Sequence, residues 1–167
     1  MAGDRRVLVV AQRDNVENDP NTLETLYPVG VIASVINRQT QVDGVLKVSI
    51  SGLHRTGIIR LIDDEFLKAE VEPIKEGRGQ SAEAVTLSRA VLNAYQVYAN
   101  VDFSSPPPGP RARHGLPSIG DPSLLADTVA PLLSIDIEKM QQLLESSDVV
   151  TRLETILDLM NAGRPTK

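Results

Sequence analysis

The chain has 167 residues, of which 41% are hydrophobic and 23% charged, with a net charge of −5 at pH 7. This composition is typical of a globular protein and argues against disorder throughout. No apolar run approaches the roughly 18 residues of a transmembrane helix, and the apolar run near the N-terminus is too short for a signal-peptide core. The acidic balance argues against strong nucleic-acid binding, and the absence of cysteine excludes disulfides and thiolate zinc sites. We therefore expect a cytoplasmic protein that binds neither membranes nor nucleic acid.

Residues 1–78 predict a β-rich subdomain. Strand-like apolar or alternating runs occur at 6–12, 29–37, 45–51, 57–62 and 66–72. In the third run Leu46, Val48 and Ile50 share one face, since side chains alternate along a strand. Asp43-Gly44 just before it is a hairpin signal, because these residues tolerate the positive φ of a tight turn. In the last run Leu67, Ala69 and Val71 are expected to point inward. Sequential hairpins of this kind predict a mostly antiparallel sheet or a small barrel.

Residues 79–163 predict a helical subdomain, interrupted by a proline-rich insert at 104–120 that has no helical pattern. Apolar residues at helical spacing give three expected stripes: Leu87, Val91, Ala94, Tyr95 and Tyr98; Ile137, Met140 and Leu144 after Asp136; and Val149, Leu153, Ile156, Leu157 and Met160 after the cap Ser147. A further helix is expected to start at Asp121 as its cap, with Pro122 in the first helical position. Strands first and helices second predict the α+β class.

One short stretch, "DGVLKVSISGLHRT" at 43–56, holds an aspartate, two serines and a histidine, and so raises the question of a Ser-His-Asp hydrolase. Such a triad needs the imidazole between the hydroxyl and the carboxylate, and spacings along one hairpin rarely give that geometry. The nucleophile-elbow pattern G-x-S-x-G is also missing. We expect a solvated hairpin face, with no catalytic residue.

Cofactor and metal sites are not predicted either. The sequence has no Gly-Lys dipeptide and hence no phosphate-binding Walker loop. Its two histidines, His54 and His114, are too far apart in the sequence to suggest a metal site. The acidic triplet at 63–65 reads as a β-turn rather than a cation site. We therefore expect no cofactor, no metal site and no catalytic residue.

At this point the sequence resembles a known family, the N-terminal domain of Lon proteases. The matching residues of the first half are Leu26, Tyr27, Val29 and Gly30, then Asp43 and Gly44, then Gly52 and Arg55. The second half adds "DPSLLADTVAPLL" and "KMQQLLESSDVVTRLETILDLM", which are similar to the helical part of that domain. Two segments depart from the family pattern: the family's first strand and helix are not found, and the proline-rich insert replaces a short helical connection.

The resemblance implies a fold and a function. The family fold is a PUA-like antiparallel β-barrel followed by a helical bundle, which agrees with the α+β pattern. Lon proteases carry this domain ahead of an ATPase module and a Ser-Lys protease module, neither of which is recognisable in these residues. The resemblance thus implies a non-catalytic domain that recognises unfolded or damaged proteins for an ATP-dependent protease. The implied partners are those proteins and the other Lon subunits of a full-length ring.

Candidate substrate-binding residues lie at two places. Tyr27, Pro28 and Val29 stand where the chain enters the expected central strand, and His54 and Arg55 lie at the hairpin exit. The structural alternative is that Tyr27 and Val29 only seal the edge of the barrel. Two other functions stay open: a stand-alone adaptor of the same domain family, and an RNA-binding module, since PUA-like barrels also occur in RNA-modification proteins.

Overall fold

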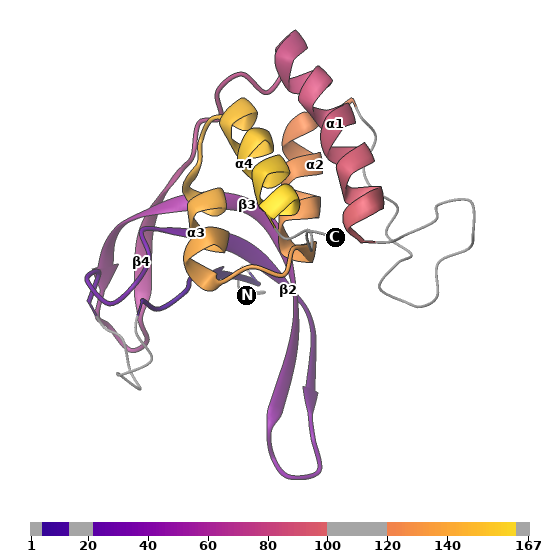
Figure 1. Ribbon diagram of the computed structural model, residues 1–167. Coiled ribbons are helices and arrows are strands. Elements are labelled where there is room, and N and C mark those ends of the chain that lie inside the picture. The colour runs from indigo at the N-terminus through magenta and orange to yellow at the C-terminus, as the bar shows by residue number, and fades with distance from the viewer. Residues whose placement is uncertain (1–4, 14–21, 100–119, 163–167) are drawn as a thin grey trace. The chain divides into compact units, whose positions relative to one another are not determined.

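A computed structural model describes residues 5–13, 22–99 and 120–162 (Figure 1). The chain divides into two compact units, residues 1–74 and 75–167. All strands of the described chain belong to the first unit and all its helices to the second, so the α+β class is confirmed. No helix in the described part is long and apolar enough to cross a membrane. Apart from Gly120, the proline-rich insert lies outside the described residues.

The first unit is one antiparallel sheet in the order β1-β2-β3-β4. Its strands are β1 (Arg6–Val9), β2 (Val29–Thr40), β3 (Leu46–Ile62) and β4 (Lys68–Pro73). In the described residues β1 and β4 are the two edges and do not pair with each other, so this sheet is open. The closed PUA-like barrel is therefore not confirmed. Leu67, expected inward, lies outside β4 and is 47% exposed.

β3 is one strand of 17 residues, so the prediction of two separate strands at 45–51 and 57–62 was wrong. Gly52 does not break the strand, because it stays in register with Ala33 of β2. The ladder absorbs its irregularity through register shifts at Ile32/Ala33 and Val35/Asn37, which leave Leu53 and Ile36 without an opposite residue. Such bulges bend a strand without ending it.

Two glycines are required by the sheet. A Cβ at Gly30 would lie 2.6 Å from the Val9 carbonyl oxygen, so β1 can approach β2 this closely only because that position lacks a side chain. Gly44 has φ +84° and its N–H donates to the Gln41 carbonyl, while the Gln41 N–H donates to the Val45 carbonyl. The hairpin turn expected at Asp43-Gly44 is thus confirmed, with Gly44 in the left-handed conformation that favours glycine.

The outer half of the β2–β3 hairpin extends beyond the other strands (Figure 1). β1 pairs with residues 31–34 of β2, and β4 pairs with residues 56–62 of β3. Residues 36–51, which we call the arm, therefore form a two-stranded ladder of their own, and every one of them is exposed. The apolar face formed by Leu46, Val48 and Ile50 is real, but nothing in the described chain buries it.

The second unit is a helical bundle with its own apolar core. Its elements are α1 (Ala82–Tyr98), α2 (Pro122–Val129), the 3-10 helix η2 (Ala130–Leu132), α3 (Ile137–Glu145) and α4 (Val149–Ala162). α4 packs against both α1 and α2. The expected stripe of α4 is confirmed: Val149, Leu153, Ile156 and Met160 are fully buried, and Leu157 is partly buried against the same core. Asp121 caps α2 as expected, since its carboxylate accepts from the Leu124 N–H. α3 begins after Asp136 as expected, and the Asp136 carboxylate caps it by accepting from the Lys139 N–H.

Two details of the helical prediction were wrong. Of the expected stripe of α3, Met140 packs against the core and Leu144 is half buried, but Ile137 is half exposed, and the buried residues of the helix are Gln141 and Leu143. The cap of α4 is Asp148, whose Oδ1 accepts from the Thr151 N–H at 2.9 Å. The carbonyl of Ser147 accepts instead from the Gly77 N–H at 3.0 Å.

The segment before α1 is held to the start of α4 by backbone and charge. The Val149 N–H donates to the Gly77 carbonyl at 3.0 Å. Arg78 donates from Nε and Nη2 to the two carboxylate oxygens of Asp148, at 2.7 and 2.6 Å. Bidentate pairs of this kind hold the two side chains in a defined orientation and also contribute interaction energy. Arg78 adopts φ +54°, an uncommon conformation for a residue with a side chain, and this pair helps to hold it.

Arg152 of α4 carries a guanidinium whose side chain is only 1% exposed. Its nitrogens donate to Glu76 Oε1 at 3.2 Å and to Ser123 Oγ at 2.8 Å, and Nη1 lies 3.3 Å from Asp127 Oδ1. The side chains of Glu76 and Asp127 are 33% and 44% exposed, so the cation is the group that has lost its hydration. One buried charge thus joins the segment before α1, α2 and α4.

This difference in burial predicts that removing the two carboxylates destabilises the helical unit more than removing the cation does. Glu76→Gln and Asp127→Asn together remove the two carboxylates that pair with the buried cation in the described chain, and should lower the free energy of unfolding by about 3–5 kcal/mol. Arg152→Met replaces the cation with an apolar side chain and leaves two carboxylates that water can reach, so it should cost less. Urea titrations followed by circular dichroism at 222 nm measure both. A larger loss for Arg152→Met would contradict this account.

The Arg78–Asp148 pair predicts a dependence on pH. Hydrogen bonding to Arg78 holds the pKa of the Asp148 carboxyl far below its usual value. A lowered folded-state pKa adds stability above the unfolded pKa of about 3.9, and this stability is lost as the pH falls below it. Asp148→Asn keeps a capping side chain but loses the charge, so its urea midpoint should fall below wild type at pH 7. The gap should narrow below about pH 4. Asp158→Asn, at an exposed position of the same helix, is the control and should show no such gap.

Candidate functional site

The first candidate segment, Tyr27 to Val29, leads into β2. The Tyr27 N–H donates to the Ala11 carbonyl at 3.0 Å, which ties the segment to the chain just after β1. The guanidinium of Arg13 lies 4.9 Å from the centre of the Tyr27 ring, and its Nε donates to the Leu26 carbonyl at 2.9 Å. Tyr27 is only 9% exposed, Val29 is half buried and Pro28 is exposed. A ligand could therefore reach Pro28 directly, whereas the ring of Tyr27 is covered.

The second candidate segment, His54 and Arg55, lies on β3. These residues are in register with Ile32 and Val31 of β2, respectively. Val29 is in register with Gly57, so the ladder brings both candidate segments to the base of the same hairpin. His54 is exposed and Arg55 is 8% exposed. Of the five candidates, Pro28 and His54 therefore have exposed side chains; Pro28 lies just before β2, and His54 lies on β3.

The hairpin does not assemble a catalytic triad from its polar residues. The Asp43 carboxylate accepts from the Val45 N–H at 3.0 Å and so serves the turn. Ser49 and Ser51 lie on the arm, while His54 follows the bulge at Leu53 and pairs with Ile32. Among the residues that the structure describes, no group of three or more His, Asp or Glu side chains could hold a metal ion.

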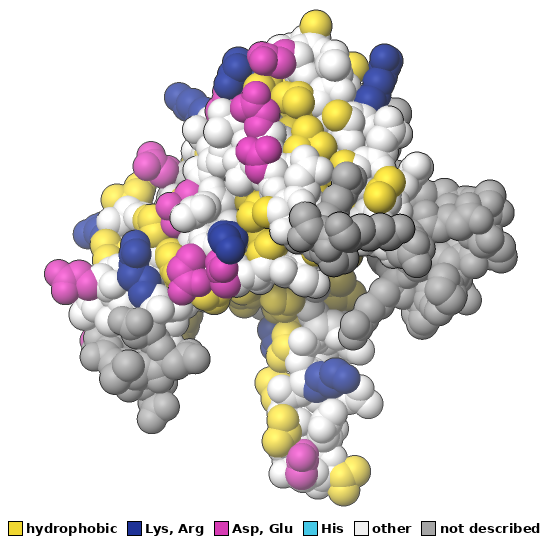
Figure 2. Space-filling view, viewed as in Figure 1, with side chains coloured by type: hydrophobic (Ala, Val, Ile, Leu, Met, Phe, Trp, Pro, Cys, Tyr) yellow, Lys and Arg dark blue, Asp and Glu magenta, His cyan; other side chains and the backbone are white. Residues whose placement is uncertain are grey.

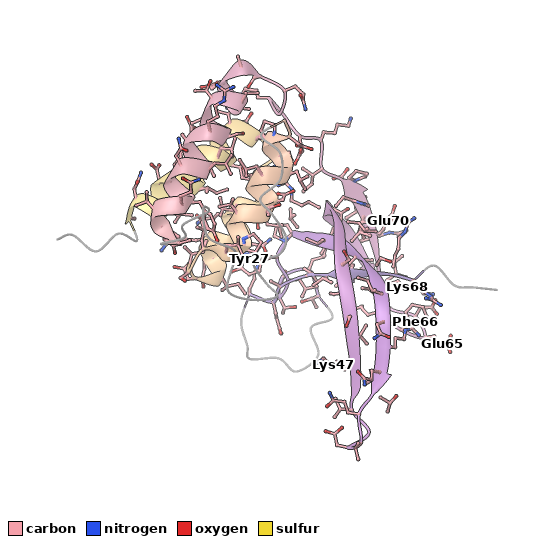
Figure 3. The ribbon with its side chains drawn as sticks, turned by 90° about the vertical axis from the view of Figure 1, so that its right-hand side faces the viewer. Tyr27, Lys47, Glu65, Phe66, Lys68 and Glu70 are labelled. Carbon is pink, nitrogen blue, oxygen red and sulfur yellow. The ribbon has the colours of Figure 1, made fainter. Side chains whose placement is uncertain are left out.

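The sequence prediction missed how much of the apolar surface of the sheet is exposed. On the arm and next to it, the exposed apolar side chains are Ile36, Val42, Val45, Leu46, Val48, Ile50 and Leu53 (Figure 2). The turn between β3 and β4 adds Phe66, which is 62% exposed and has the Lys68 ammonium 4.7 Å from its ring centre (Figure 3). Alternation along β3 indicated an apolar face, but no local signal says whether another element covers it.

The hairpin also differs in charge from the rest of the chain. Residues 29–62 contain four basic side chains, Arg38, Lys47, Arg55 and Arg60, and one acidic side chain, Asp43, which gives a net charge of +3 in a chain of net charge −5. Arg60 is paired with Glu70 of β4 at 2.5 Å. The arm itself contains Arg38, Lys47 and Asp43, which gives it a net charge of +1, and the apolar face of its β3 strand is exposed.

Comparison with known proteins identifies relatives over almost the whole chain. The family described as the ATP-dependent protease La (LON) substrate-binding domain matches residues 1–162. The Lon protease of Azospirillum brasilense is 32% identical over 161 residues, which are 96% of this chain and 19% of that protein. The Lon protease of Escherichia coli K12 is 31% identical over 97% of this chain and 20% of its own length. The chain thus spans about a fifth of the length of these relatives.

Solved structures support the same fold. The N-terminal domain of the Mycobacterium avium complex Lon protease is similar with a TM-score of 0.58 and 21% identity, over 95% of this chain and 91% of that one. A Lon N-terminal domain protein from Xanthomonas campestris gives a TM-score of 0.53 and 18% identity, over 86% of this chain and 72% of that one. At these identities the likeness concerns the fold.

The burial of Tyr27 predicts the effect of its replacement. Tyr27→Ala removes a covered ring and should lower the free energy of unfolding of the sheet by about 3–5 kcal/mol. Tyr27→Phe keeps the ring under Arg13 and should cost much less. Urea titrations followed by NMR amide signals of the sheet measure both changes. If Tyr27→Ala leaves the stability unchanged, the ring is not part of the packed structure and is available to a ligand.

Proposed function

Since the chain belongs to the family of Lon substrate-binding domains, we propose that it binds unfolded or damaged polypeptides for an ATP-dependent protease and catalyses no reaction by itself. The match of the family over residues 1–162 is the observation that carries this proposal. The chain spans about a fifth of its curated relatives, so the ATPase and protease activities would reside in other parts of such a protein.

The surface of the sheet supports the proposal. Unfolded proteins differ from folded ones mainly in the apolar side chains that they expose, and a receptor for them needs accessible apolar surface with a polar rim. On β3 the arm offers Leu46, Val48 and Ile50 on one face and polar side chains on the other, while β2 places Thr40 and Arg38 opposite Leu46 and Val48. An exposed apolar surface of this kind fits an unfolded polypeptide better than a small ligand, which prefers an enclosed pocket.

The base of the hairpin would contribute further contacts. We assign the direct contacts to Pro28 and His54, whose side chains are accessible, with Val29 at the margin. Tyr27 and Arg55 would act by holding the backbone of the two segments in place, since they are 9% and 8% exposed. A single domain of this kind should bind weakly, and several copies on one ring would raise the avidity without new contacts.

The proposal predicts a preference for the unfolded form of one polypeptide. A reduced, permanently unfolded protein should shift the NMR amide signals of the sheet at high micromolar concentrations, and its native form should not. The binding should persist from low to moderate salt, because apolar contacts are not screened. Arm variants with Leu46→Ser and Ile50→Ser should weaken it, while Leu132→Ser, at a half-exposed leucine of η2, serves as the control.

Two results would contradict the proposal. Equal binding of native and unfolded forms would mean that apolar exposure is not recognised. Tighter binding of a short single-stranded RNA, with an affinity that falls steeply with salt, would favour the nucleic-acid alternative. The basic charge of the hairpin makes this RNA titration necessary.

A further inference from the structure

The outer edge of β3 is open along the arm. β4 pairs with β3 only as far as Thr56, which is in register with Pro73 at the end of β4. Residues 46–55 of β3 therefore have β2 on one side and, within the described chain, no strand on the other. Exposed edges of this length are where additional strands pair, so natural sheets usually block them with bulges, prolines or charges. Between Leu46 and Ser51 this edge has no bulge, no proline and one charged residue, Lys47.

The backbone groups that point to this edge can be identified from both ends of the arm. At the tip, Gln41 and Val45 face each other, because the Gln41 N–H donates to the Val45 carbonyl. At the base, the Val35 N–H donates away from β3, to the Arg5 carbonyl. Because the direction of the peptide groups alternates along an antiparallel strand, both observations give the same result. The residues whose N–H and C=O groups point outward are Leu46, Val48 and Ile50.

The same three residues carry the apolar face. Their side chains are 57%, 42% and 46% exposed, respectively. A strand added to this edge would form hydrogen bonds with their peptide groups and would place every second side chain beside theirs. The remaining side chains of the added strand would lie on the other face, next to Lys47, Ser49 and Ser51.

Lys47 determines which charge fits on that second face. Its side chain projects from the arm (Figure 3), and no ion pair to it is present in the described chain. The hairpin around it has a net charge of +3. A cross-strand neighbour of opposite charge is favourable and one of like charge is unfavourable. An acidic side chain opposite Lys47 is therefore the best partner.

We propose that the outer edge of β3 at residues 46–51 binds an extended polypeptide segment as an added β-strand, and that it prefers segments in which apolar residues alternate with acidic ones. This inference rests on the proposed function and specifies how the polypeptide is bound and which segments are selected. Main-chain hydrogen bonds give an affinity that depends little on sequence, and the apolar face and Lys47 give the preference. A folded protein would not bind, because its strands are already paired.

Two other occupants fit this edge less well. A second copy of the chain would pair through a strip about 20 Å long and about 10 Å deep, or about 200 Å² on each partner, whereas a stable interface needs about 800 Å² on each side. Single-stranded RNA is bound largely by stacking on aromatic rings, and residues 29–62 contain no Phe, Tyr or Trp. A weak, reversible contact with an extended peptide is consistent with both the small area and the exposed backbone.

The test uses the ¹⁵N-labelled chain and three capped heptapeptides. The first alternates valine or isoleucine with glutamate or threonine, the second has the same composition with its apolar residues in one block, and the third is the first with N-methyl groups on the three amides that would face β3. The first peptide should move the amide protons of Leu46, Val48 and Ile50 downfield, with smaller shifts at Lys47, Ser49 and Ser51. The blocked and N-methylated peptides should bind at least about tenfold more weakly, because each loses several favourable pairings.

A charge-reversal pair tests the preference without changing the backbone. Lys47→Glu should weaken binding of the acidic peptide about two- to fivefold and improve binding of an analogue with lysine in place of glutamate. Lys75→Glu makes the same change at an exposed residue outside the hairpin and should leave both affinities as they are. The spectra of the variants show directly that the sheet stays folded.

The possible results separate this inference from the proposed function. If an unfolded protein binds but no peptide shifts the arm amides, strand addition is wrong and the proposed function stands. If unfolded proteins do not bind at all, both are wrong. Equal affinity of the N-methylated peptide, a salt-sensitive RNA shift at the same amides, or a concentration-dependent dimer formed through them would each overturn strand addition.

Discussion

The pairing of β2 with β3 is the constraint on which the sheet and its functional surface depend. β2 is the only strand in the described chain that joins β1 to the rest of the sheet, and β3 is the only one that joins β4. The two strands are also much longer than their neighbours, so their ladder continues where β1 and β4 have ended. The same length that organises the sheet therefore creates an exposed arm. The length of β2 and β3 thus accounts both for the order of the sheet and for its exposed surface.

Local sequence signals predicted most of the helical unit. Caps such as Asp121 and Asp136 act through bonds within one turn, and the apolar spacing of α4 needs only one buried side, so both can be recognised without knowing the rest of the fold. The prediction failed where a residue far away in the sequence determines the local structure. Ser147 and Asp148 are both good caps, and the partner of the backbone at Gly77 determines which of them takes the role.

The sheet was less predictable for the same reason. Gly52 looked like the end of a strand, but its pairing with Ala33 keeps β3 continuous. Alternation at Leu46, Val48 and Ile50 showed that one face is apolar, and apolar faces are usually covered. Whether a face is covered depends on the position of other segments, and this information is not contained in residues 43–56.

The sequence predicted where the candidate residues lie, but not which of their side chains are exposed. The resemblance to Lon domains directed attention to Tyr27 and to His54 and Arg55, and the ladder does bring these segments to one end of the hairpin. Burial then separates the exposed Pro28 and His54 from the covered Tyr27 and Arg55. Arg13 covers Tyr27 from a part of the sequence that shares no motif with it, so no pattern around Tyr27 could have shown this.

The two bulges of the hairpin have a mechanical consequence. The extra residue on β3, Leu53, shifts the register by one position, and the extra residue on β2, Ile36, shifts it back. The tip of the hairpin is consequently in the register that it would have without either bulge. All of the irregularity of the β2–β3 ladder is confined to a short stretch between the two, next to the start of β1 at Arg6. Because bulges bend and twist a ladder locally, this stretch sets the direction in which the arm leaves the rest of the sheet. Adding or removing facing pairs of residues beyond it would change the length of the arm and leave that direction and the register unchanged.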